Sequence, residues 1–164
     1  LRDDKAFELL NEIKIDIIKG NASEIAKLAG ENVATKGVEA TEVSADLTKI
    51  AENLAKQKNA VVVITGKNDI IANGNETYIV KNGHKMMSSI VGTGCMAASI
   101  IASFAAVEKN YAKAAASALV CFGIAGELVA KEAKGPGTFK ENLYDEIYNL
   151  DEEKINLMKK FEKR

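Results

Sequence analysis

The chain has 164 residues, 47% of them hydrophobic, which is enough to bury one sizeable core and makes one globular domain the default. With 22 basic and 23 acidic residues the net charge is -1, so we expect neither nucleic acid nor an anionic membrane as a partner. No apolar run approaches the ~20 residues of a membrane span, and we expect no signal peptide. The two cysteines, Cys95 and Cys121, are typical of free thiols in a reducing compartment, which favours the cytoplasm.

The first residues predict a helix followed by a short strand. The chain begins with Leu1 instead of Met, and we expect it to be a fragment or one chain of a protein split in two. Acidic and then apolar residues at helical spacing predict a helix over residues 3–13. Residues 15–18 then form the strand candidate.

A second helix is predicted to begin at Asn21. This residue suits the N-cap position, Glu24 lies three residues further on as in a capping box, and Gly30 marks the end. Starting a helix is a sufficient reason for the pair. The alternative is that the carboxylate of Glu24 lies beside bound phosphates and collects Mg²⁺, through water because Mg²⁺ dehydrates reluctantly.

The middle of the chain predicts a loop, a helix and a buried strand. Glycines and threonines over residues 35–41 indicate the loop, and residues 44–58 indicate the helix. The continuous β-branched run 60–65 is typical of a strand that is buried on both faces of a parallel sheet. Ligands gather at the carboxyl ends of such strands, so Thr65 either donates its hydroxyl to a phosphate or simply ends the strand.

The next segment predicts an antiparallel meander over residues 69–90. Three short strands, 69–72, 77–80 and 85–90, are separated by the turn dipeptides Asn73-Gly74 and Asn82-Gly83. The remaining elements are helices, the last of them charged and on the surface. They are predicted over residues 97–108, 111–134, 138–148 and 151–164. The single histidine, His84, excludes a zinc site of several histidines, and its place beside a turn favours a surface role over a catalytic one.

The stretch Gly92-Thr93-Gly94-Cys95 precedes the most apolar of these helices. Its two glycines allow backbone N–H groups to approach an anion, and the positive end of the helix dipole adds to the attraction. Cys95 falls in the first helical turn, where that dipole favours a thiolate. A Gly-x-Gly turn is also a common way to pass from a strand to a helix, so an anion site is one of two interpretations.

Five motifs, in this order, resemble the ribokinase-like small-molecule kinases and, among them, the hydroxyethylthiazole kinases of thiamine biosynthesis. The motifs are Gly20-Asn21-Ala22-Ser23-Glu24-Ile25, Ile64-Thr65-Gly66, Asn82-Gly83-His84, Gly92-Thr93-Gly94-Cys95 and Lys134-Gly135-Pro136-Gly137-Thr138-Phe139. The resemblance covers nearly the whole chain. It implies an α/β, ribokinase-like fold with a central, mostly parallel sheet flanked by helices, of which residues 1–164 form the C-terminal, nucleotide-binding part of one kinase domain.

The resemblance also implies an activity, the ATP-dependent phosphorylation of the hydroxyl of 4-methyl-5-(2-hydroxyethyl)thiazole. ATP and Mg²⁺ are the implied cofactors. By the same comparison Arg2, Thr65 and Thr93 are expected to contact ATP, and Glu24 is expected to support Mg²⁺.

The glycine turn takes the remaining roles that the resemblance implies. Gly92 is expected at the thiazole, and Gly94 with Cys95 is expected to form an anion hole. In most ribokinase-like enzymes the position of Cys95 holds an aspartate that acts as a base, whereas the thiazole kinases are similar to this chain in having cysteine. Since phosphoryl transfer depends chiefly on positioning and charge stabilisation, we expect Cys95 to be a supporting base or an orienting group.

Thiazole kinases carry a substantial N-terminal part before the position of Leu1, with most of the thiazole contacts. Unless a second polypeptide supplies this part, we expect the chain to hold the nucleotide half and to lack much of the acceptor pocket. The resemblance also implies a homotrimer. Three alternatives stay open. They are a cysteine-nucleophile enzyme built on Cys95, a non-catalytic nucleotide-binding fragment, and a related phosphomethylpyrimidine kinase or hydrated-nicotinamide dehydratase, both of which usually have aspartate where Cys95 stands.

Overall fold

The computed structural model describes the backbone of residues 2–31 and 40–164 and the side chains of residues 5–31 and 47–164. Most of the loop expected over residues 35–41 lies outside this described part. The chain divides into two compact units. The first comprises Leu1–Gly66, Ile70–Thr77 and Arg164, and the second comprises Lys67–Asp69 and Tyr78–Lys163.

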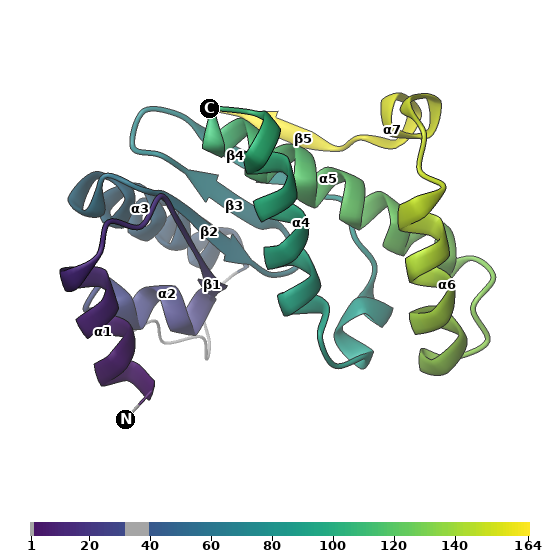
Figure 1. The fold of residues 1–164 in the computed structure, drawn as a ribbon, viewed down its shortest axis with the longest axis horizontal. Coiled ribbons are helices and arrows are strands. Elements are labelled where there is room, and N and C mark those ends of the chain that lie inside the picture. The colour runs from purple at the N-terminus through teal and green to yellow at the C-terminus, as the bar shows by residue number, and fades with distance from the viewer. Residues whose placement is uncertain (1, 32–39) are drawn as a thin grey trace. The chain divides into compact units, whose positions relative to one another are not determined.

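The first unit combines helices with strands in both orientations (Figure 1). In order they are α1 (Arg2–Glu12), β1 (Ile17–Asn21), α2 (Ala22–Leu28), α3 (Ala40–Lys58), β2 (Val61–Thr65) and β3 (Asp69–Ala72). β1 runs parallel to β2, and β3 runs antiparallel to β2. The predicted helices and strands are confirmed, with β1 beginning two residues later than expected and α3 four residues earlier.

The core of this unit is centred on β2. Its residues Val61 to Ile64 are all buried, as the β-branched run predicts. Helices α2 and α3 pack against the parallel strand pair and against each other. Ile25 and Leu54 are almost fully buried in these helices, and burying each stabilises the fold by about 1.5–3 kcal/mol.

The second unit is organised around one long helix. Its elements are β4 (Thr77–Val80), the 3-10 helix η1 (Lys85–Ser89), α4 (Thr93–Val107), α5 (Tyr111–Ala130), α6 (Pro136–Tyr148), α7 (Glu152–Met158) and β5 (Phe161–Lys163). α5 packs against α4, α6 and α7 (Figure 1), and also against η1.

By length and composition α5 could cross a membrane, so the expectation that no apolar run approaches that length was wrong. Of its most apolar window, 72% is buried inside the structure, which is the pattern of a core helix.

Two predictions in this unit were wrong. Residues 85–90 are not a strand, because 85–89 form η1, whose N-cap His84 accepts a hydrogen bond at Nδ1 from the Met86 N–H at 3.3 Å. Residues 151–164 are not one helix, because α7 ends at Met158 and β5 follows. β5 pairs antiparallel with β4, with Ile79 opposite Glu162. A distant segment thus takes the pairing edge that the meander assigned to residues 85–90.

Candidate functional site

The carboxyl ends of β1 and β2 meet at one edge of the first unit. The two strands are parallel, and Asn21 at the end of β1 lies opposite Thr65 at the end of β2. The Thr65 hydroxyl donates to the Gly20 carbonyl at 3.4 Å. Thr65 is only partly buried, so its hydroxyl remains within reach of a ligand at this edge.

A complete capping box starts α2 at the same edge. The Glu24 N–H donates to Asn21 Oδ1 at 3.0 Å, and the Asn21 N–H donates to Glu24 Oε2 at 2.7 Å. The Ser23 hydroxyl also donates to Asn21 Oδ1, at 2.8 Å. The predicted N-cap is therefore confirmed, and it fixes the carboxylate of Glu24 beside the end of β1.

Capping and metal binding are compatible at Glu24. The residue is exposed, and its bond to Asn21 uses only one of its two carboxylate oxygens, Oε2. Among the described residues no three His, Cys, Asp or Glu side chains gather as a metal site. A single carboxylate such as that of Glu24 suits Mg²⁺, because this ion commonly keeps several waters and binds one or two carboxylates together with substrate phosphates.

Gly20 makes room for this arrangement, a role that the sequence pattern did not reveal. A Cβ on Gly20 would lie 3.1 Å from Glu24 Cβ, from Glu24 Oε2 and from Ile25 Cδ1. A side chain at this position would therefore crowd the Glu24 carboxylate, which would have to shift by a few tenths of an ångström. The available signal was a glycine inside a strand, which often marks a close approach of another group.

The glycine turn lies in the second unit and begins α4. Gly92 is the N-cap, with φ 103° and ψ -8°, and no side chain caps this helix end. A Cβ on Gly92 would meet nothing within 4 Å, so glycine is favoured here by the left-handed backbone and not by crowding.

The backbone amides of this turn are available to an anion. The first intrahelical bond runs from the Met96 N–H to the Gly92 carbonyl at 2.9 Å, so the preceding amides of the first turn have no partner within the helix. Gly94 and Cys95 are exposed, and Gly92 and Thr93 are partly exposed. The turn is thus open to solvent, as an anion site requires.

The two cysteines occupy different environments. Cys95 is exposed in the first turn of α4, whereas Cys121 in α5 is partly buried, and this burial raises the pKa of its thiol. The environment of Cys121 agrees with an inert core thiol. His84, the one candidate base for a cysteine nucleophile, uses Nδ1 to cap η1.

The predicted site residues therefore form two groups. Glu24 and Thr65 lie together in the first unit, and Gly92 to Cys95 form one turn in the second. Arg2 is the first residue of α1, and its side chain lies outside the part of the structure that is described.

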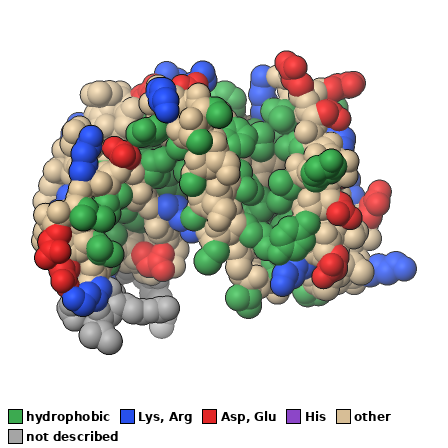
Figure 2. Space-filling model, viewed as in Figure 1, with side chains coloured by type: hydrophobic (Ala, Val, Ile, Leu, Met, Phe, Trp, Pro, Cys, Tyr) green, Lys and Arg blue, Asp and Glu red, His purple; other side chains and the backbone are tan. Residues whose placement is uncertain are grey.

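A hollow of about 180 Å³ lies elsewhere in the second unit. It is lined by Ile100, Phe104, Cys121, Phe122, Ile147, Leu150 and Ile155. Figure 2 shows hydrophobic side chains gathered over this region, between α4 and α6. None of the predicted site residues lines it, and its walls offer almost no polar group to orient a phosphorylated ligand.

Comparison with known proteins identifies the family. The model of the hydroxyethylthiazole kinase family matches residues 1–153. The chain belongs to the hydroxyethylthiazole kinase family. The hydroxyethylthiazole kinases of Methanosarcina mazei and Methanosarcina acetivorans are similar to it, with 60% and 59% identity over 98% and 99% of this chain. The chain spans 62% of the length of each.

Solved structures confirm the fold class. A hydroxyethylthiazole kinase from Pyrococcus horikoshii OT3 matches 99% of this chain and 60% of its own, with a TM-score of 0.88 and 36% identity. Bacillus subtilis YxkO, of the UPF0031 family, matches 82% of this chain and 49% of its own, with a TM-score of 0.59 and 18% identity, which indicates a shared fold alone. The α/β fold and the resemblance to the thiazole kinases are thus both confirmed.

Proposed function

We propose that residues 1–164 form the C-terminal, nucleotide-binding part of an enzyme that transfers a phosphoryl group from ATP to the hydroxyl of 4-methyl-5-(2-hydroxyethyl)thiazole. The observation that carries this proposal is the 60% identity to an enzyme named hydroxyethylthiazole kinase, over 98% of the chain. The same similarity favours this activity over a phosphomethylpyrimidine kinase or a hydrated-nicotinamide dehydratase.

The strand ends of the first unit suit the nucleotide and its metal. In this proposal Arg2, Thr65 and Thr93 contact ATP, and Glu24 holds Mg²⁺ through water. The exposed carboxylate, fixed by its bond to the Asn21 N–H, supports this role. Bound Mg²⁺ would neutralise charge on the phosphates.

The glycine turn suits the transferred phosphoryl group. Gly92 would lie at the thiazole, and the amides of Gly94 and Cys95 would donate to the oxygens on which negative charge gathers. The open first turn of α4, with no capping side chain, supports this role. Since the transition state is loose, the side chain of Cys95 would orient the acceptor hydroxyl or, in its thiolate form, take up the hydroxyl proton, and would not be a nucleophile.

Steady-state ATP turnover with the thiazole alcohol, measured on the complete protein, tests the proposal. Cys95→Asp should stay active or become faster, because an ordinary aspartate is almost wholly ionised at neutral pH whereas an ordinary cysteine is only a few per cent thiolate. Gly94→Val should lose activity, because a branched side chain crowds the anion hole. An inactive Cys95→Asp variant of normal stability would argue for thiol chemistry and against this mechanism.

For assembly we propose a cytoplasmic homotrimer, completed by polypeptide equivalent to the part of the relatives that this chain does not cover. Helix α4 supports the existence of a partner surface: it is apolar on nearly all sides, yet among its residues only Ala97 and Ile101 are buried. Val107 at its end is 83% exposed. Intact-mass measurement with light scattering tests this, since a monodisperse monomer of this chain alone would contradict it.

A further inference from the structure

We propose that Asn82 and Glu127 are positioning residues that fasten both the C-terminal strand β5 and the segment leading to the glycine turn onto α5. The inference rests on the proposed function in one respect only, the claim that this fastening supports phosphoryl transfer. All the residues involved belong to the second unit.

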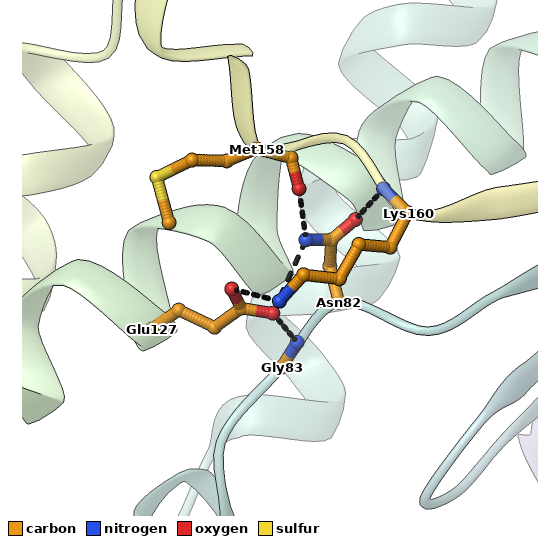
Figure 3. Close-up of polar contacts among 5 residues, drawn as sticks. All are labelled: Asn82, Gly83, Glu127, Met158 and Lys160. Carbon is orange, nitrogen blue, oxygen red and sulfur yellow. Dashed lines mark hydrogen bonds and ion pairs between the residues drawn. The ribbon is translucent and has the colours of Figure 1, made fainter. Parts of the chain in front are cut away.

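Glu127 gathers three donors from two distant parts of the chain (Figure 3). Its Oε1 accepts from the Gly83 N–H at 3.0 Å and from Asn82 Nδ2 at 3.1 Å. Its Oε2 accepts from Lys160 Nζ at 2.8 Å. The side chain of Glu127 is only 14% exposed, so a carboxylate left without these donors would be costly. Glu127 thus joins Gly83, which lies just before η1, to Lys160, which lies just before β5.

Asn82 completes the junction with hydrogen bonds in both directions. Nδ2 also donates to the Met158 carbonyl at 2.9 Å, and Oδ1 accepts from the Lys160 N–H at 2.7 Å (Figure 3). Its side chain therefore pairs with the backbone between α7 and β5 as a neighbouring strand would. With 5% exposure it is one of the few buried polar residues among those described. The three hydrogen bonds of this buried asparagine side chain together favour one arrangement of the junction.

The segment that Asn82 begins is pressed closely against α5. A Cβ on Gly123 would lie 2.6 Å from the carbonyl carbon of Asn82, and a Cβ on Gly126 would lie 2.6 Å from Met87 Sδ. Residues 82–87, here called the η1 segment, thus pack on one face of α5. Glu127, one position after Gly126, holds them there through its hydrogen bonds. The glycine turn begins five residues after Met87, on the same continuous path.

The hydrogen bonds of Asn82 and Glu127 also influence the position of the glycine turn. α4, which starts at the turn, packs on the same α5. The turn is therefore held from both sides by α5, through η1 before it and α4 after it. Loosening Asn82 and Glu127 frees the first of these attachments and leaves the second. A displacement of about 1 Å at a reacting group can cost about 100-fold in rate, so a loosened η1 segment should weaken catalysis without unfolding the protein.

The test compares Glu127→Ala with Glu146→Ala in the complete protein, because a glutamine at position 127 could still accept from Gly83 and Asn82. Glu146 is the matched control, because it forms a similar ion pair with Lys154 at 3.0 Å and its side chain is 24% exposed. Backbone hydrogen exchange of the peptides covering residues 84–96 is followed by mass spectrometry. Exchange should become faster in Glu127→Ala and stay unchanged in Glu146→Ala. Unchanged exchange in Glu127→Ala would overturn the positioning role.

Kinetics then test the link to catalysis. At a temperature well below every melting midpoint, Glu127→Ala should lower kcat/KM for ATP by about tenfold or more, while Glu146→Ala stays near the wild type. Lys160→Arg, which keeps the ion pair, should retain wild-type values. Equal kinetics in Glu127→Ala and the control would overturn the link. A wild-type protein without ATP turnover would instead refute the proposed function, and the exchange experiment would still decide the positioning role.

Discussion

Replacing Glu24 by glutamine separates the two roles that this residue can have. The Glu24 carboxylate caps α2 through Oε2, 2.7 Å from the Asn21 nitrogen. A glutamine oxygen can accept the same hydrogen bond, so Glu24→Gln keeps the cap and removes the negative charge. Glu24→Ala removes both.

The expected magnitudes follow from this geometry. Glu24→Gln loses only the attraction between the carboxylate and the helix dipole, about 0.3–1 kcal/mol, which is about 1–4 °C in the melting midpoint of a chain of this size. Glu24→Ala loses the hydrogen bond as well, about 1 kcal/mol more. If Glu24 holds Mg²⁺ through water, either change should raise the Mg²⁺ requirement by about 10–100-fold.

The assay is the kinase rate as a function of free Mg²⁺ at constant ATP, with thermal unfolding measured on the same samples. Asp151→Asn is the matched control, because Asp151 caps α7 by accepting from the Lys154 N–H at 2.8 Å and loses its charge in the same way. A wild-type Mg²⁺ dependence in Glu24→Gln would refute the metal role and leave Glu24 as a helix cap alone.

Three further predictions concern the second unit. Gly123→Ala should lower the free energy of unfolding by about 1–3 kcal/mol, because its Cβ would lie 2.6 Å from the backbone of Asn82. Gly137→Ala is the control, since a Cβ there meets nothing within 4 Å, and urea unfolding of both variants checks the difference. Iodoacetamide should modify exposed Cys95 faster than Cys121, whose thiol pKa is raised by burial, and ATP with Mg²⁺ should slow the reaction at Cys95. Peptide mass spectrometry at timed intervals measures both rates, and equal rates at the two cysteines would contradict this prediction. Burial alone would raise the pKa of Glu127, but hydrogen bonds from Lys160, Gly83 and Asn82 outweigh it and lower that pKa. The stability that Glu127 contributes should therefore be complete above its unfolded-state pKa of about 4.3 and be lost as the pH falls through the lower folded value, so the urea midpoints of wild type and Glu127→Gln should converge in acid; a constant difference would contradict this.

Local signals in the sequence were enough where the structure depends on neighbouring residues. The capping box of Asn21 and Glu24 needs only a spacing of three residues, and the buried strand β2 needs only a β-branched run. The family resemblance followed from such local motifs. Contacts between distant residues left no comparable signal. Asn82 was interpreted as a turn residue, although its side chain bonds Met158 and Lys160, and β5 was interpreted as the end of a helix.

The candidate site has the same division between what is local and what is not. The proposed anion site is formed by main-chain amides at the start of α4, which every residue except proline possesses. The sequence can therefore indicate such a site only through residues that allow the required backbone conformation. Gly92 is such a residue, since φ 103° strains any side chain even where space is free. Gly123 and Gly126 are a different case, because crowding by the η1 segment requires them and only the three-dimensional packing shows why. A glycine in this chain can therefore belong either to the proposed site or to the surface that holds the site in place. Gly92→Ala should impair ATP turnover directly, because it strains the turn. Gly123→Ala should impair ATP turnover only as far as it displaces the η1 segment.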